Sequence, residues 1–176
     1  MEKNWEEIRK LAGEYAEDNL QNGYNCAESV LYALIRSGAI DVPVETIKYA
    51  TGFGGGCGGA GLTCGALTSA IMANNIVHGR LNPKPGEEGR LEMRAVYYPR
   101  SNNIVSDFVK ENKSGLCSEI INQFPDGYFD EQTRGNCIRV CGVAARIAVD
   151  YLQIDVEEAS KLKYDESVIR INNWME

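Results

Sequence analysis

Apolar residues recur at three- and four-residue steps through most of the chain, which is the spacing of one face of an α-helix. Near the N-terminus, four residues mark one such face: Trp5, Ile8, Leu11 and Tyr15. A second helix is predicted to begin after Asn25, because Glu28 three places later completes a capping box. Its apolar positions keep helical spacing until Gly38, where we expect the helix to end.

The rest of the chain continues the helical pattern. Gly79 is predicted to end one helix, and Pro99 to kink or break another. The further predicted helices occupy 43–51, 63–77, two pieces of 87–112, 117–124, 136–152 and, in the polar segment 153–176, roughly 155–173. No stretch alternates apolar and polar residues for long enough to predict a strand. We therefore expect an all-α fold: a single-domain bundle of about six to eight helices over residues 1–176, with a glycine-rich loop beside its cysteines.

The charge of the chain limits its partners. Its 176 residues contain 25 acids and 18 bases, a net charge of −7. Nucleic acids and anionic membrane surfaces need clustered cations, so we expect neither as a partner. No segment approaches the roughly 18 uninterrupted apolar residues of a membrane span, so we expect no membrane insertion. The charged N-terminal segment lacks the features of a secretory signal, and we expect a cytoplasmic protein with reduced thiols.

A glycine-rich segment, GFGGGCGGAGLTC, covers residues 52–64 and contains seven glycines and two cysteines. Glycines at this density let backbone N–H groups approach another group closely. Because two cysteines interrupt them, we expect that group to be sulfur or a sulfur-bound metal. We predict that six of the glycines contact the cofactor, with their N–H groups offsetting negative charge on the sulfur atoms: Gly54, Gly55, Gly56, Gly58, Gly59 and Gly61.

Cysteines are predicted at several helix starts. Three of them directly follow a residue that favours the helix N-cap: Cys26, Cys64 and Cys137. Cys117 follows Ser114 by three residues, again near a predicted helix start. The helix dipole at such positions favours a thiolate over a thiol. If four thiolates meet at one point they repel one another, and an iron–sulfur cluster or a zinc ion would neutralise them. There is no CxxC pair, so spacing alone leaves metal binding and redox thiols equally open.

Four segments together resemble the C-GCAxxG-C-C family of redox-active proteins: YNCAESVLYAL, TGFGGGCGGAGLTCGALTSAIMA, SGLCSEII and CIRVCGVAARIA. The resemblance covers roughly residues 5–152, and the four cysteines of the family pattern match Cys26, Cys64, Cys117 and Cys137. It implies an all-helical, redox-active protein, from a family often encoded near transporter genes. A similarity to the iron–sulfur part of split-Soret cytochrome c implies a [2Fe–2S] centre bound by these cysteines.

The chain departs from the family pattern at three positions. Ser69 stands where the motif ends in glycine, so that CGAxxG reads CGALTS, and Cys57 and Cys141 are additional cysteines. Cys57 is close enough in the sequence to Cys64 to serve as an alternative ligand or a resolving thiol. We interpret Cys141 as a buried structural thiol.

Two other features of the sequence give weaker indications of function. The loop also satisfies GxGxxG, but the segment before it looks helical, and a dinucleotide site needs a strand there. His78 is expected to lie at the end of its helix rather than bind a metal.

Three hypotheses of function follow. The first is an electron-transfer protein with an iron–sulfur cluster on the four motif cysteines, serving an unidentified electron donor or acceptor; zinc is the alternative metal. The second is a metal-free thiol–disulfide protein or sensor that pairs either Cys57 with Cys64 or Cys137 with Cys141. The first pair is favoured, because Cys137 and Cys141 are four residues apart on one helix, which strains a disulfide. The third is a non-catalytic helical module linked to transport. Enzyme activity and a homodimer are left open.

Overall fold

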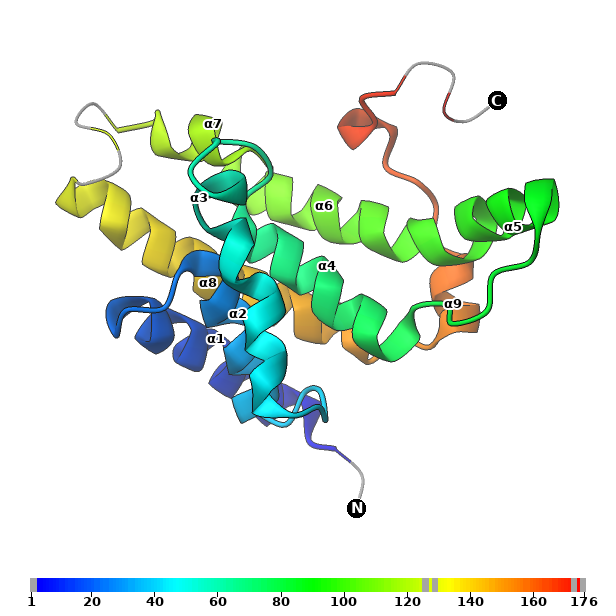
Figure 1. The fold of residues 1–176 in the computed structure, drawn as a ribbon, viewed down its shortest axis with the longest axis horizontal. Coiled ribbons are helices and arrows are strands. Elements are labelled where there is room, and N and C mark those ends of the chain that lie inside the picture. The colour runs from blue at the N-terminus through cyan, green and yellow to red at the C-terminus, as the bar shows by residue number, and fades with distance from the viewer. Residues whose placement is uncertain (1–2, 125–126, 128–129, 172–173, 175–176) are drawn as a thin grey trace.

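The computed structural model describes residues 3–124, 127, 130–171 and 174. Helices dominate these ranges, and the only β-type pairing in them is an isolated antiparallel bridge between Thr63 and Leu116. The all-α prediction is confirmed. Figure 1 shows α1, α2, α4 and α8 packed side by side, with α6 along one edge of the group.

The helices fall into two sets. The first half of the chain contains α1 (Trp5–Gln21), α2 (Cys26–Arg36), the 3₁₀ helix η1 (Val44–Phe53), the single turn α3 (Gly54–Cys57) and α4 (Gly65–His78). The second half contains α5 (Gly86–Glu92), the π-helical η2 (Met93–Tyr97), α6 (Tyr98–Asn112), α7 (Cys117–Ile121), α8 (Glu131–Leu152), α9 (Val156–Ser160) and the 3₁₀ turn η3 (Glu166–Val168).

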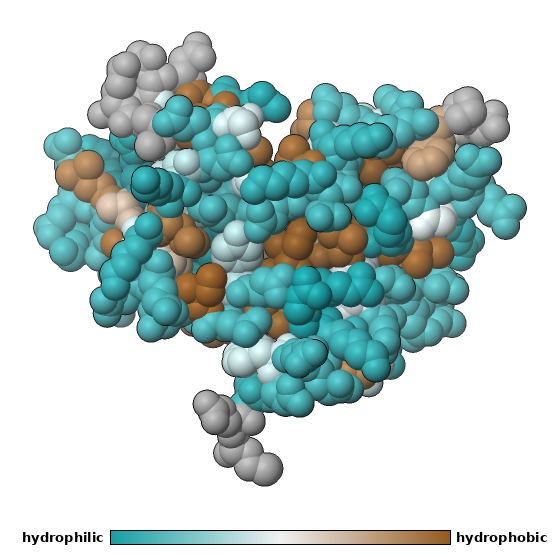
Figure 2. Space-filling model, turned by 180° about the vertical axis from the view of Figure 1, so that it is seen from behind, coloured by the Kyte–Doolittle hydropathy of each residue, from teal (hydrophilic) through white to brown (hydrophobic). Residues whose placement is uncertain are grey.

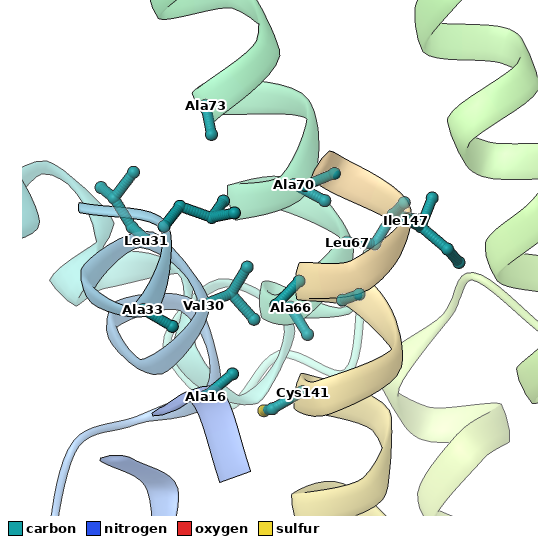
Figure 3. Packing of buried hydrophobic residues seen from close by; sticks show 14 of the residues in the cluster. Ala16, Val30, Leu31, Ala33, Ala66, Leu67, Ala70, Ala73, Cys141 and Ile147 are labelled. Atoms are coloured by element: carbon teal, nitrogen blue, oxygen red, sulfur yellow. The ribbon is translucent and has the colours of Figure 1, made fainter. Parts of the chain in front are cut away.

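Small side chains allow the central helices to pack closely. Ala66 on α4, Val30 on α2 and Cys141 on α8 are all buried, and Figure 3 shows them in one cluster between the three helices. Interiors of this kind are filled to the density of organic crystals, so each backbone is held firmly by its neighbours. The helices α2, α4 and α8, which position three of the cysteines, are therefore part of the packed core.

Two of the predicted helix starts are wrong. α8 begins at Glu131 because the Asp130 side chain accepts a hydrogen bond from the Thr133 N–H at 3.0 Å, so Cys137 lies in the second turn instead of the first. Thr63 is not the cap of α4; Cys64 itself occupies the N-cap position. By contrast, Asn25 caps α2 in the predicted capping box, with Cys26 as the first helical residue.

The sequence predicts a kink or break at Pro99, and the structure has a π-helical turn just before it. This turn is η2, which lies between α5 and α6. The backbone stays helical from Gly86 to Asn112, so the chain is not broken there.

The end of α8 is fixed by side chains from two neighbouring helices. The buried Arg100 on α6 donates to the carbonyls of Tyr151 and Ile154, the latter at 2.6 Å. His78, the last residue of α4, has its Nε2 atom 3.1 Å from the Leu152 carbonyl oxygen. His78 therefore lies at its helix end, as predicted.

The predicted C-terminal helix over 155–173 is wrong for most of its length. It stops at Ser160, and the chain then runs along α6. Hydrogen bonds to α6 replace those of a helix: Asn103 donates to the Lys163 carbonyl at 2.9 Å, and Asn102 accepts from the Asp165 N–H at 2.7 Å. Residues 172, 173, 175 and 176 lie outside the described ranges.

The surface is mostly hydrophilic, with a hydrophobic patch in the middle of the face seen in Figure 2. Among the described helices, none combines the length and the apolar character that crossing a bilayer requires.

Candidate cysteine site

Four cysteines that are far apart in the sequence line one cavity of about 40 Å³: Cys26, Cys64, Cys117 and Cys137. They come from the first residue of α2, the N-cap of α4, the first residue of α7 and the second turn of α8. The tertiary fold thus places four cysteines from distant segments around one cavity. The rest of the lining is Gly55 and apolar side chains: Leu20, Ile120, Ile121 and Val140.

Cys26 is positioned by its own helix start and by α8. The Asn25 side chain accepts hydrogen bonds from the N–H groups of Ala27 and Glu28 at 2.9 and 3.0 Å, which fixes the first turn of α2. The thiol of Cys141 on α8 donates to the Cys26 carbonyl oxygen at a distance of 3.8 Å. Both contacts restrict where the Cys26 sulfur can lie.

The glycine loop contains one left-handed turn. Gly55, Gly56, Cys57 and Gly58 all have φ between 64 and 69°, and the Gly58 N–H donates to the Gly54 carbonyl at 2.9 Å. For residues with a β-carbon this conformation is less stable by roughly 1–2 kcal/mol, which explains why most positions of the turn are glycine. Cys57 is the one residue of these four that has a β-carbon.

Main-chain pairing connects the loop to the start of α7. The Cys64 N–H donates to the Gly115 carbonyl at 2.8 Å, and the Cys117 N–H donates to the Leu62 carbonyl at 2.6 Å. A β-carbon on Gly56 would be 2.6 Å from the Leu62 nitrogen, so only glycine lets the loop approach this closely. Cys64 and Cys117 are therefore fixed beside each other by backbone hydrogen bonds.

The predicted role of the loop amides needs a correction. The N–H groups of Gly58, Gly59 and Gly61 donate to carbonyl oxygens of Gly54 and Gly55 inside the loop. They are satisfied by the left-handed turn and are not free to face a sulfur atom. Of the six glycines predicted to contact a cofactor, Gly55 lines the cavity, whereas Gly54, Gly56, Gly58, Gly59 and Gly61 do not.

Burial determines the protonation of the cysteine thiols. Burial, with the nearby Cys26 as the second cause, raises the pKa of Cys64 to about 12, although the N–H groups of Ala66 and Leu67 lower it. The same two causes raise the pKa of Cys117 and of Cys137 to about 11. At Cys64, desolvation outweighs the helix N–H groups, and at Cys117 and Cys137 burial and neighbouring cysteines raise the pKa. All three thiols therefore depart from the thiolate preference that was predicted for helix starts.

The two additional cysteines have different surroundings. Cys141 is fully buried one turn after Cys137, and burial raises the pKa of its thiol well above the usual range. It therefore stays protonated and acts as the hydrogen-bond donor to Cys26. Cys57 is exposed and does not line the cavity.

Two residues that sequence reasoning did not place at the site also position Cys26. A β-carbon on Gly65 would be 2.7 Å from the Cys26 sulfur, so the sulfur lies against the backbone of α4. The buried Ser69 hydroxyl donates to the Ala27 carbonyl at 2.7 Å and connects α4 to the first turn of α2. The departure from the family motif at Ser69 thus supplies a contact between the two helices.

An all-sulfur donor set suits an iron–sulfur cluster, and also zinc. Within the described ranges, no three His, Cys, Asp or Glu side chains are close enough as they stand to hold one metal ion. The four thiols that line the cavity fit a cluster by their chemistry, because thiolates are the ligands that such clusters use.

Comparison with known proteins agrees with the family resemblance of the cysteine motifs. The family model described as "Putative redox-active protein (C_GCAxxG_C_C)" matches residues 24–151. An uncharacterized protein of Archaeoglobus fulgidus is 29% identical over 130 residues, which cover 73% of this chain and 85% of that protein. No solved structure matches the chain significantly.

Proposed function

This chain belongs to the C_GCAxxG_C_C family, and we propose that it binds an iron–sulfur cluster through its four motif cysteines and transfers electrons. The observation that carries the proposal is that Cys26, Cys64, Cys117 and Cys137 line a single cavity. Nothing in their spacing requires these residues to meet, since they come from four separate elements. Three or four of them would serve as ligands.

The surroundings of the thiols favour a cation. Burial disfavours thiolates at Cys64, Cys117 and Cys137, as their raised pKa values show. Four uncompensated thiolates in this cavity would repel one another, and each would also lose hydration worth several kcal/mol. An iron–sulfur cluster supplies the compensating positive charge and one-electron redox chemistry.

The other residues at the site have supporting roles. Leu20, Ile120 and Val140 exclude water from the cavity, which lowers the local dielectric constant and thereby affects a reduction potential. The N–H groups of Ala66 and Leu67 point at the Cys64 sulfur and stabilise negative charge on it. The protein therefore provides both a dry cavity and hydrogen-bond donors.

The family resemblance favours a [2Fe–2S] cluster, and zinc is the alternative on an all-sulfur site. The remaining expectations go with this function: a cytoplasmic location, where reduced thiols persist, and an electron donor or acceptor as partner. A homodimer is left to measurement.

Anaerobic purification followed by iron, acid-labile sulfide and zinc analysis tests the proposal. We expect iron and sulfide in equal amounts, with visible absorption that bleaches on reduction. A colourless protein without iron or sulfide, even after reconstitution, would rule the cluster out. Stoichiometric zinc would assign a structural metal, and a reversible loss of two hydrogens in the metal-free protein would favour thiol–disulfide chemistry.

A further inference from the structure

A second and larger cavity lies between α4 and α6. It is a cleft of about 540 Å³, and its apolar side chains come from both helices and from η3: Leu67, Ile71, Val105, Val109 and Val168. Leu67 is buried, and the other four are half-buried. This volume lies in the range of about 300–1,000 Å³ that is typical of small-molecule sites, and the lining is apolar as in such sites.

Two cations line the same cleft. Lys113 follows the end of α6, and Arg170 comes from the C-terminal segment. Within the described ranges, neither side chain forms an ion pair. Both side chains are exposed at the cleft, so their charges are accessible to a ligand.

One acidic side chain lines the cleft as well, and a serine holds it at the start of α7. Glu119 also lines the cleft, and its carboxylate accepts a hydrogen bond from the Ser114 hydroxyl at 2.5 Å. The Ser114 hydroxyl oxygen in turn accepts from the Leu116 N–H at 3.0 Å. The Ser114 hydroxyl is neutral, so Glu119 keeps its negative charge. The charged side chains that line the cleft, Lys113, Arg170 and Glu119, therefore sum to a charge of +1.

We propose that this cleft binds a small free molecule with an apolar body and one anionic group. The apolar body would lie between α4 and α6 against Val105 and Val109, where it would replace water over half-buried side chains. The anionic group would lie at Lys113 and Arg170, which supply the opposite charge.

The cleft adjoins the cysteine cavity through a single layer of backbone. Thr63 and Leu116 line the cleft, whereas the next residues along the chain, Cys64 and Cys117, line the cavity. The bridge between Thr63 and Leu116 separates the two. A bound molecule would therefore lie next to the proposed redox site, although its binding does not depend on whether the cysteines hold a cluster.

Calorimetric titration with decanoate below its micellar concentration tests the proposal, with decanol as the uncharged comparison. We expect saturable binding of one decanoate per chain, weaker binding of decanol, and a decanoate affinity that falls with added salt. Equal affinity for decanoate and decanol would overturn the assignment of the anionic group. The absence of saturable decanoate binding would overturn the site itself.

Variants locate the binding. The double substitution Lys113→Gln with Arg170→Gln should weaken decanoate binding about three- to tenfold, as expected for two exposed charges. Lys110→Gln is the matched control, because Lys110 lies on α6, pairs with Asp107 and does not line the cleft. Val109→Trp should fill the cleft and remove binding, with thermal unfolding as the check on folding. Unchanged affinity in a folded Val109→Trp protein, or an equal loss in Lys110→Gln, would place decanoate elsewhere and overturn the proposal.

Discussion

The sulfur of Cys26 lies against the α-carbon of Gly65, so closely that a β-carbon at position 65 would be 2.7 Å from it. The carbonyl oxygen of Phe53 would be equally close. This contact joins the first residue of α2 to the first residue of α4. The glycine after Cys64 in the family motif therefore has a steric role: it leaves room for the sulfur atom of another cysteine.

Gly65→Ala is expected to destabilise the protein by about 1–3 kcal/mol, the usual cost of overpacking a filled interior. Because the added methyl group meets the Cys26 sulfur, it should also reduce the iron that the protein retains after reconstitution. Urea unfolding and iron analysis measure the two effects.

Gly135→Ala is the matched control for this substitution. Gly135 lies within α8, and a β-carbon there would meet nothing within 4 Å. Replacing it should stabilise the protein by about 0.5–1 kcal/mol, since alanine favours the helix. Equal effects of the two substitutions would contradict a steric role of Gly65.

Ser69→Ala is expected to lower the free energy of unfolding by about 0.5–1.5 kcal/mol, the value of one buried hydrogen bond. The lost bond is the one to the Ala27 carbonyl, at 2.7 Å. Ser69→Gly restores the family motif but should cost about 1 kcal/mol more, because glycine is unfavourable inside a helix. Denaturant titration of both variants tests this order, and a more stable glycine variant would contradict it.

Cys57→Gly is expected to leave stability unchanged or raise it by about 1 kcal/mol. The φ of Cys57 is 67°, and glycine adopts this conformation without the steric cost that a β-carbon brings. Gly56→Ala, with a similar φ of 68° but a neighbouring backbone nitrogen 2.6 Å from the new β-carbon, should destabilise the protein strongly. Thermal unfolding distinguishes the two, and a strongly destabilised Cys57→Gly protein would show that the Cys57 side chain makes a stabilising contact.

Cys64→Ser is expected to lose most of the bound iron and the visible absorption, whereas Cys57→Ser keeps both. Cys64 lines the cavity, and Cys57 is exposed and outside it. Iron analysis and absorption spectra after parallel anaerobic reconstitution give the comparison. Loss of iron in both variants would favour a ligand role for Cys57.

Stability of the reduced, metal-free protein is expected to fall as the pH rises above about 8.5, where ordinary thiols lose their proton. The pKa of Cys64 is raised to about 12 and that of Cys117 to about 11, so the folded protein keeps protons that the unfolded chain releases. The stabilisation is complete below about pH 8.5 and is lost as the pH rises toward the folded pKa values. The slope is at most about 1.4 kcal/mol per pH unit for each thiol.

Urea unfolding at pH 7.5 and pH 10, with reductant and chelator, measures this loss. Cys117→Ala should reduce the difference between the unfolding free energies at pH 7.5 and pH 10, because one thiol with a raised pKa is then missing. A variant with the same pH dependence as the wild type would show that other groups cause it.

The sequence predicted those parts of the fold that local chemistry determines. Asn25 and Glu28 form the expected capping box, and a π-helical turn lies just before Pro99, where a kink or break was expected. The motif resemblance and the predicted helix starts led us to expect four cysteines at one site. In the structure all four line one cavity.

The wrong predictions concern competition between local and distant contacts. Asn136 looked like a cap, but Asp130 starts α8 earlier, and Asn136 instead accepts a hydrogen bond from Arg139. The polar segment after Ser160 has a helical composition, but hydrogen bonds with α6 hold it extended around Asp165. The thiol pKa values depend on burial, which no local pattern reveals.

The four cavity cysteines are supplied by elements that run from α2 to α8, and α8 packs along α1. A nascent chain on the ribosome therefore lacks the complete cavity until α8 has emerged, so all four thiols are available together only after this region has been synthesised.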